Sequence, residues 1–213
     1  MLGLAFLFGG ISSIAALIIE AAAAPMLNNT LITLPHIINS NISEYLGFAI
    51  VEEVVKFFFI YLLVRKSPYF DEPIDAMIYL ITGALGFATV ENVLIALSGG
   101  GTQIFGTLLS RFIGATLLHA LTAGLIGHFW ARGIKFKMEG RFVFGGLVMA
   151  SLFHATFNIL VVQFSDILIY PTVFLGLIGF FVLYDFQDLR KIEEIEEKAK
   201  EQQTTPYVRE DVV

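Results

Sequence analysis

The sequence contains no cysteine, one tryptophan and few charged residues. The lack of cysteine excludes disulfides, thiolate metal ligands and a cysteine nucleophile. Charged residues make up only 15% of the 213 positions, whereas 56% are apolar, and the mean hydropathy is +0.77. Soluble domains carry about one quarter charged residues, so this composition predicts an integral membrane protein surrounded by a lipid bilayer.

Most of the net charge lies at the C-terminal end, and the rest of the chain is nearly neutral. The net charge is −6, and residues 185–213 hold nine acidic and five basic residues, which accounts for −4 of it. No basic patch indicates a nucleic-acid partner. We expect a membrane domain over residues 1–185. A charged cytoplasmic tail should follow over residues 186–213, helical at first and then disordered.

Six apolar segments are long enough to cross a bilayer. A hydrocarbon core of about 30 Å requires roughly 20 helical residues, and such runs lie near residues 2–24, 44–65, 74–97, 104–131, 142–164 and 166–185. The first run ends in small residues that resemble a signal-peptide cleavage site, but no basic residue precedes it, which favours a retained span. The predicted fold is an all-α polytopic bundle of about six transmembrane helices.

The distribution of Lys and Arg predicts the orientation of this bundle. Eleven of the thirteen basic residues follow the second, fourth or sixth segment, and the other two, Lys56 and Arg111, lie inside segments. Loops rich in Lys and Arg stay on the cytoplasmic side of a membrane. Both termini are therefore expected in the cytoplasm.

The second segment carries Glu52, Glu53 and Lys56 in apolar surroundings. Each such group costs roughly 2.5 to 3.5 kcal/mol at the centre of a membrane helix, so ionisable residues there normally face a protein-lined interior. Lys56 lies three and four residues after the glutamates and can reach both. One carboxylate then stays ionised while burial favours protonation of the other, a division that suits general acid–base chemistry. A purely structural ion pair is the alternative interpretation.

Three further segments carry polar residues at helical spacing. Phe87 and Glu91 are four apart, as are His154 and Asn158, and His119 has Thr122 one turn later. A rise of 1.5 Å per helical residue places four of the ionisable side chains at a similar depth in the membrane. They are Glu52, Glu53, His119 and His154. His128 is nine residues from His119 and points about half a turn away, so we exclude it from the cluster.

These motifs resemble, in their order on four successive segments, the PrsW family of intramembrane proteases, a distant relative of the CAAX-prenyl endopeptidase and bacteriocin-processing group. The motifs are Glu52-Glu53-x-x-Lys56, Phe87-x-x-x-Glu91-Asn92, His119 and His154-x-x-x-Asn158. The resemblance covers about residues 44–164. It implies a helical peptidase of a prokaryotic cell membrane that cuts a membrane-associated protein, such as an anti-sigma factor. The CAAX group has Glu-Glu-x-x-x-Arg and Phe-x-x-x-His, so prenyl-protein processing is not implied.

For such a hydrolysis we assign a catalytic set. Glu52 activates water, Glu53 is held by Lys56 and orients Glu52, and His119 positions the water. His154 and Asn158 donate to the oxyanion, while Glu91 and Phe87 support the site. No cofactor is required in this scheme. A divalent metal such as zinc is the other possibility, with ligands drawn from Glu52, Glu53, Glu91, His119 and His154.

Two other function classes stay open at the level of the sequence. Carboxylates and histidines at membrane depth also form the relays of proton- or cation-coupled transporters, although the chain lacks the internal repeat that many transporters show. A non-catalytic membrane protein that binds peptides is the other class. For a peptidase we expect a polar cavity between the second and fifth segments, walled by residues including Phe87 and Phe153. It should open to the non-cytoplasmic face or to lipid.

Overall fold

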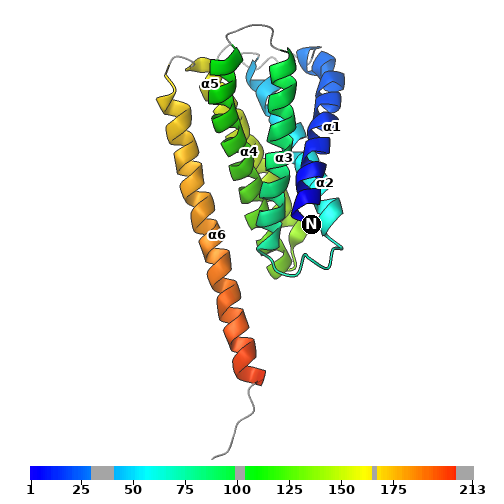
Figure 1. Cartoon of the computed structure of the whole chain (residues 1–213), viewed down its shortest axis with the longest axis vertical. Helices are drawn as coiled ribbons and strands as arrows, with labels where there is room; N and C mark the ends of the chain where they lie inside the picture. The colour runs from blue at the N-terminus through cyan, green and yellow to red at the C-terminus, as the bar shows by residue number, and fades with distance from the viewer. Residues whose placement is uncertain (30–40, 99–103, 165–166, 205–213) are drawn as a thin grey trace, which may run out of the picture.

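The computed structural model describes the chain apart from residues 30–40, 99–103, 165–166 and 205–213, and the described residues form an all-α bundle (Figure 1). The helices are α1 (Leu2–Asn29), α2 (Asn41–Val64), α3 (Asp75–Ser98), α4 (Ile104–Lys135), α5 (Glu139–Gln163) and α6 (Ile169–Thr204). Each predicted apolar segment overlaps one of them over most of its length. The all-α fold expected from the sequence is therefore confirmed, and the disordered end expected for the tail lies outside the described residues.

Five of these helices are long and apolar enough to cross a membrane, judged by length and composition: α1, α3, α4, α5 and α6. The remaining helix, α2, has 24 residues and is long enough, but it carries Glu52, Glu53 and Lys56 within its apolar part. It packs against α1, α3 and α5. A helix with three ionisable residues is stable at this depth because neighbouring helices cover them.

Short turns with defined chemistry join the helices at one end of the bundle. Before α3, the side chain of Asp75 accepts hydrogen bonds from the backbone N–H groups of Asp71 and Glu72, at 3.1 and 3.2 Å. Between α4 and α5, Lys137 has φ 55°, in the left-handed region that closes a tight turn. These two turns join consecutive antiparallel helices with few connecting residues.

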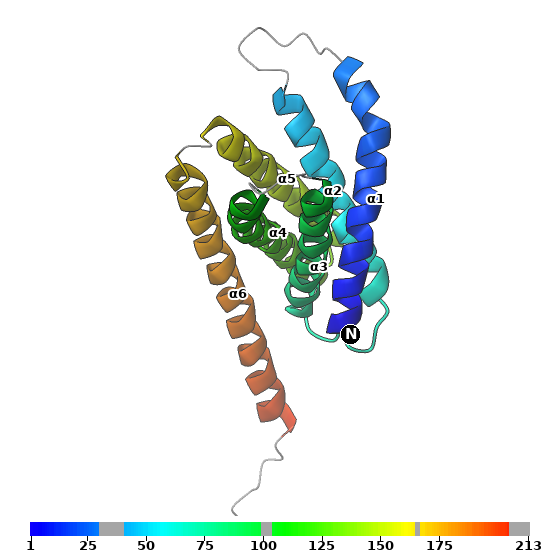
Figure 2. The ribbon, with the colours of Figure 1, turned by 45° about the horizontal axis from the view of Figure 1, so that its top comes forward.

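The helices α1 and α3 approach each other at glycines. A Cβ atom added at Gly86 would lie 1.9 Å from the carbonyl oxygen of Phe6, and one at Gly9 would lie 1.8 Å from that of Gly83. Small residues allow such close backbone contact between membrane helices. The approach places α1 along one side of α2 and α3, while α6 runs along α4 on the other side (Figure 2).

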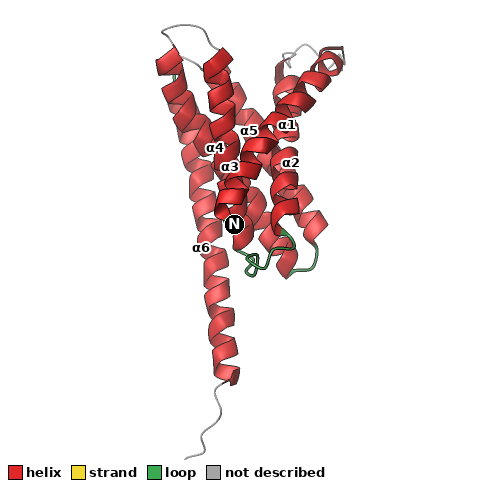
Figure 3. Ribbon diagram, turned by 45° about the vertical axis from the view of Figure 1, so that its right-hand side comes forward, coloured by secondary structure: helices red, strands yellow, loops and turns green. Residues whose placement is uncertain are grey.

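The N-terminus, the turn after α2, the turn after α4 and the charged part of α6 lie at the same end of the bundle (Figure 3). The basic residues of these loops therefore share one end, in agreement with the predicted orientation. At this end Trp130 is buried and stacks on Phe70 at 4.9 Å between ring centroids, with Tyr61 at 5.3 Å and Phe57 at 5.6 Å. Large rings fill the interior there, which leaves the opposite half of the bundle for a cavity.

Candidate active site

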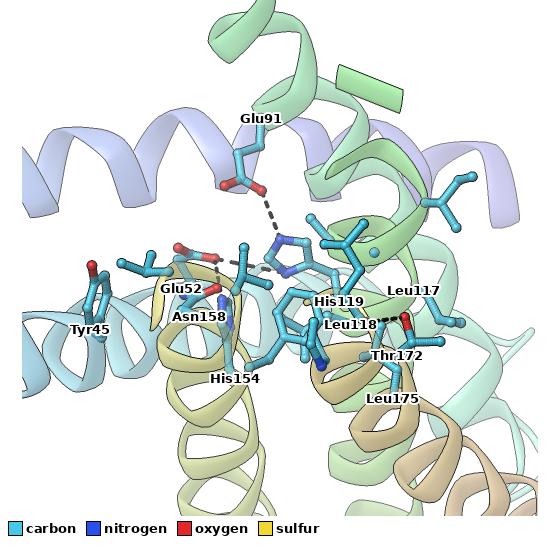
Figure 4. Close-up of a pocket in the computed structure, with 18 of the residues that line it drawn as sticks. Tyr45, Glu52, Glu91, Leu117, Leu118, His119, His154, Asn158, Thr172 and Leu175 are labelled. Carbon is cyan, nitrogen blue, oxygen red and sulfur yellow. Dashed lines mark hydrogen bonds and ion pairs between the residues drawn. The ribbon is translucent and has the colours of Figure 1, made fainter. Parts of the chain in front are cut away.

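Four helices bring the ionisable residues of the bundle interior together. The residues come from α2 (Glu52, Glu53, Lys56), α3 (Glu91), α4 (His119) and α5 (His154), and Figure 4 shows Glu52, Glu91, His119 and His154 converging. Glu53 is 0% exposed, and Lys56, His119 and His154 are each at most 3% exposed. The residues of the predicted cluster therefore share one site, as their common depth in the sequence indicated.

Glu53 is fully enclosed and accepts three hydrogen bonds at one oxygen. Its Oε1 lies 2.7 Å from Nζ of Lys56, 2.7 Å from Nδ1 of His154 and 3.2 Å from the hydroxyl of Thr122. Buried carboxylates persist when paired and hydrogen-bonded in this way. Glu53 therefore ties α2 to α4 and α5 and orients His154, whereas the sequence analysis expected it to orient Glu52.

Lys56 bridges Glu53 and His119. Its ammonium lies 2.7 Å from Oε1 of Glu53 and 2.8 Å from Nδ1 of His119. It also sits 4.8 Å from the centre of the Phe87 ring, a distance at which a cation is attracted by an aromatic face. The expectation that Lys56 bonds both glutamates is wrong in this respect, because its second hydrogen-bond partner is His119.

Glu52 turns toward the two histidines from the other side. Adjacent helical residues point about 100° apart, and Glu52 and Glu53 meet different nitrogens of His154. Oε2 of Glu52 lies 3.9 Å from Nδ1 of His119 and 3.8 Å from Nε2 of His154. This oxygen is buried and has no hydrogen-bond partner among the described residues. An unsatisfied buried acceptor of this kind needs an explanation, and a water, substrate or metal ion held between the three side chains would provide one.

Each histidine is oriented by a carboxylate at its other ring nitrogen. His154 Nδ1 lies 2.7 Å from Glu53, and His119 Nε2 lies 2.8 Å from Oε2 of Glu91. If these nitrogens carry the protons, Nδ1 of His119 and Nε2 of His154 are free to accept, and the bond from Lys56 to Nδ1 of His119 agrees with this assignment. Carboxylates in this position fix the orientation of the ring and its tautomer.

Aromatic packing supports the same two rings. The ring of Phe87 lies 5.1 Å from that of His119, and the two histidine rings meet edge to face at 5.0 Å. Phe87 is 2% exposed. It therefore forms the floor beneath His119 and Lys56 and fixes their position.

Glu52, His119 and His154 can each offer one ligand atom, all within 4.8 Å of one another. Bond lengths of about 2.0 to 2.1 Å in a tetrahedral zinc site put ligand atoms about 3.3 Å apart. Two of the separations, 3.8 and 3.9 Å, exceed this value by about 0.5 Å, and the third is at most 4.8 Å, so the three side chains must draw together to bind an ion. The sequence analysis counted Glu53 and Glu91 among possible ligands. Instead, Glu53 contacts Nδ1 of His154 and Glu91 contacts Nε2 of His119. The donor set fits a divalent ion with one open position.

The three side chains face a cavity of about 650 Å³. Glu91 and Asn158 also line it, and Asn158 lies one turn after His154 on the same face of α5. The cavity extends beyond the expected limits, because Thr172, Leu175 and Gly176 of α6 form part of its wall. The full set of lining residues is Tyr45, Phe48, Glu52, Glu91, Ile113, Gly114, Ala115, Leu117, Leu118, His119, His154, Phe157, Asn158, Val161, Val162, Leu168, Pro171, Thr172, Leu175 and Gly176.

The aromatic wall of the cavity differs from the prediction. Phe157 and Phe48 line it, whereas the predicted Phe87 and Phe153 do not. Phe87 packs against His119, and Phe153 packs edge to face against Phe174 of α6 at 6.1 Å. Thr122 and the α6 residues were missed as parts of the site. The position of Thr122 one turn after His119 was a usable signal, but α6 carries no ionisable residue at this depth that would mark it.

His128 lies apart from the site, as its helical phase indicated. Its Nε2 is 3.7 Å from Oδ1 of Asp185 on α6. This contact joins α4 to α6 nearer the end that carries the basic loops, and it shares no residue with the cluster around Glu52.

Comparison with known proteins gives matches in one family. A family model described as PrsW family intramembrane metalloprotease matches residues 1–185. Protease PrsW of Geobacillus kaustophilus (strain HTA426) is 30% identical over 116 residues, which cover 54% of this chain and 49% of the relative. Protease PrsW of Bacillus subtilis (strain 168) is 26% identical over 151 residues, or 70% of this chain and 67% of the relative. No solved structure shows a significant match.

The matches cover only part of each relative. The chain spans about half the length of the Geobacillus relative and two thirds of the Bacillus one. Its apolar helices and bacterial relatives identify an integral membrane protein of a prokaryotic membrane. Because the family model matches most of the chain, including every residue of the Glu–His cluster, this protein belongs to the PrsW family of intramembrane metalloproteases.

Proposed function

We propose that this protein is an endopeptidase that hydrolyses a peptide bond of a membrane-associated protein within the bilayer. One observation carries the proposal: the unpartnered Oε2 of Glu52 faces two carboxylate-oriented histidines at the wall of a cavity. A hydrolase needs a place where water is held and deprotonated. The side chains of Glu52, His119 and His154 surround a point that can hold one water molecule.

Glu52 acts as the general base. It accepts a proton from the water while the water oxygen forms a bond to the carbonyl carbon of the substrate. When the carbon–nitrogen bond breaks, Glu52 returns the proton to the leaving amine. The oxygen Oε2 suits this role because it has no competing hydrogen bond among the described residues and because Glu52 lines the cavity. Glu53 does not line the cavity, and its Oε1 is engaged by three donors.

The tetrahedral intermediate requires donors at its oxyanion. The amide of Asn158 lines the cavity one turn from His154. His154 would add a second donor at Nε2 when its ring carries protons on both nitrogens, while its Nδ1–H group donates to Glu53. The pair therefore stabilises negative charge on one side of the water, with Glu52 on the other.

Glu52, His119 and His154 also suit a metal-dependent form of the same hydrolysis. Glu52, His119 and His154 would hold a divalent ion such as zinc, and a bound ion supplies an activated water and polarises the carbonyl. In this form Glu53 and Glu91 keep the histidine rings in place through their outer nitrogens. Lys56 distinguishes the two forms, because its bond to Nδ1 of His119 and ligation through that nitrogen exclude each other.

The substrate class follows from the site's depth and from the family. A site inside a membrane bundle acts on a membrane-bound protein, and an anti-sigma factor is the example that the resemblance implies. Family membership supports a hydrolase over the transporter and the peptide-binding protein. A proton flux through vesicles containing the protein, without cleavage of any peptide, would instead favour the transporter.

The test is cleavage of a membrane-spanning peptide by the purified protein in lipid vesicles. Glu52→Gln and His154→Ala should each reduce cleavage at least a hundredfold, consistent with the contribution of a general base. Glu44→Gln is the matched control, since Glu44 lies in the first turn of the same helix and does not line the cavity. Full activity of Glu52→Gln would refute the proposed mechanism. Metal analysis of the purified protein, with and without chelator, separates the two forms: one equivalent of zinc, lost together with activity, supports the metal form.

A further inference from the structure

The cavity is polar at one end and apolar at the other. Glu52, Glu91, His119, His154 and Asn158 gather at the first end, and Figure 4 shows them apart from Leu117, Thr172 and Leu175. Pockets of 300 to 1,000 Å³ enclose ligands larger than one side chain, so about 650 Å³ leaves room beside the reacting bond. The apolar end therefore has a volume that the proposed hydrolysis does not use.

The rim of the apolar end is built from exposed hydrophobic residues. Ile113 and Leu117 of α4, Val162 of α5 and Leu168 before α6 line the cavity and are also 43 to 63% exposed. On membrane-spanning helices such surface meets lipid chains, because water is absent from the hydrocarbon core. The mouth of the cavity thus opens sideways into the bilayer among the outer parts of α4, α5 and α6.

Two small residues of α6 form the wall inside this mouth. A Cβ atom added at Gly176 would have no heavy atom within 4 Å, so open space faces this residue. Thr172, one turn earlier, donates its hydroxyl to the carbonyl oxygen of Leu168 at 2.7 Å. Its hydroxyl proton is therefore used within the helix and is not available to an occupant. Leu175 closes the wall behind them and is 6% exposed.

We propose that Gly176 and Thr172 form a subsite for a large apolar side chain of a transmembrane segment, next to the bond that is cleaved. The inference rests on the proposed function for the identity of the segment as a substrate. The occupant is apolar because both rim and wall are apolar, and it is part of a membrane-spanning chain because the mouth opens to lipid. Continuity with the polar end places the neighbouring peptide bond at Glu52, His119 and His154.

The first experiment fills the subsite. Wild type and Gly176→Leu are assayed in vesicles on two membrane-spanning peptides that differ only in Ala or Phe beside the cleaved bond. Poor fit in an apolar pocket changes rates by about 10 to 200-fold. We expect Gly176→Leu to lower the Phe-to-Ala ratio of kcat/KM at least tenfold. Leu177→Phe is the control, because Leu177 points about 100° away from Gly176 around α6, is 58% exposed and does not line the cavity. Its ratio should equal that of wild type. An unchanged ratio in Gly176→Leu overturns the subsite.

The second experiment detects the segment without cleavage. The chain has no cysteine, so Gly176→Cys and Leu177→Cys, each in the Glu52→Gln background, can be oxidised with a membrane peptide that carries one cysteine. Cross-linking at least fivefold stronger at position 176 supports the subsite, even if wild type cleaves no peptide and the proposed hydrolysis fails. Equal cross-linking at the two positions overturns the subsite, even where cleavage by wild type supports the proposed function.

Discussion

Replacing Glu53 by glutamine should destabilise the protein more than any other conservative change in α2. The substitution keeps the shape of the side chain and removes its charge. Lys56, which is 3% exposed, then remains buried without its anionic partner. At 2.7 Å the pair attracts by about 6 kcal/mol at an effective dielectric constant of 20. A glutamine oxygen still accepts a hydrogen bond from the ammonium, worth about 2 kcal/mol, so we expect a loss of about 4 kcal/mol.

This value agrees with the 3 to 5 kcal/mol generally lost when one partner of a buried ion pair is removed. A double-mutant cycle with Lys56→Met isolates the interaction. Removing both charges leaves no unpaired ion. The double variant should therefore lose at least about 2 kcal/mol less free energy of unfolding than the sum of the losses in the two single variants. Glu44→Gln, near the start of the same helix, should change stability by less than 0.5 kcal/mol, as do most substitutions away from buried pairs.

The single tryptophan gives a direct assay. Trp130 is buried against Phe57 and Tyr61 of α2, so its fluorescence reports whether this helix stays packed. Unfolding would be followed in mixed micelles of mild detergent and dodecyl sulfate. A loss below about 1 kcal/mol in Glu53→Gln, or single losses that simply add, would refute the claim that Glu53 and Lys56 are a tightly coupled buried pair.

Three other predictions concern helix packing, His128 and topology. Gly86→Ala should cost about 1 to 3 kcal/mol because its Cβ overlaps the backbone of α1, measured by the same fluorescence; Gly3→Ala meets no atom within 4 Å and should be silent. His128→Ala should keep peptide cleavage within twofold of wild type, since its contact is with α6 outside the cluster; a large drop in kcat would show that it belongs to the site. A cysteine at Phe136 should be labelled only from the cytoplasmic side, and one at Gly100 only from outside, and the reverse pattern would contradict the orientation.

Much of the site could be predicted from the sequence, because residue spacing gives the face of a helix on which each side chain lies. Four-residue spacing placed His154 and Asn158 on one face of α5, and nine-residue spacing separated His128 from His119. The structure agrees in both cases. The cost of burying Glu52, Glu53 and Lys56 indicated that they face a protein interior, which they do. These inferences succeeded because they depend only on the geometry of a single helix and on the solvent around it.

The division of roles between Glu52 and Glu53 depended on the tertiary structure. The sequence shows two adjacent carboxylates, but only the approach of α4 and α5 decides which one meets Lys56, Thr122 and His154 and which one faces the cavity. The part played by α6 was likewise undetermined, because Thr172 and Gly176 carry no charge and show no pattern apart from that of a membrane helix. Burial costs and helical periodicity act within one segment, whereas partners and cavities arise from packing between segments distant in the chain.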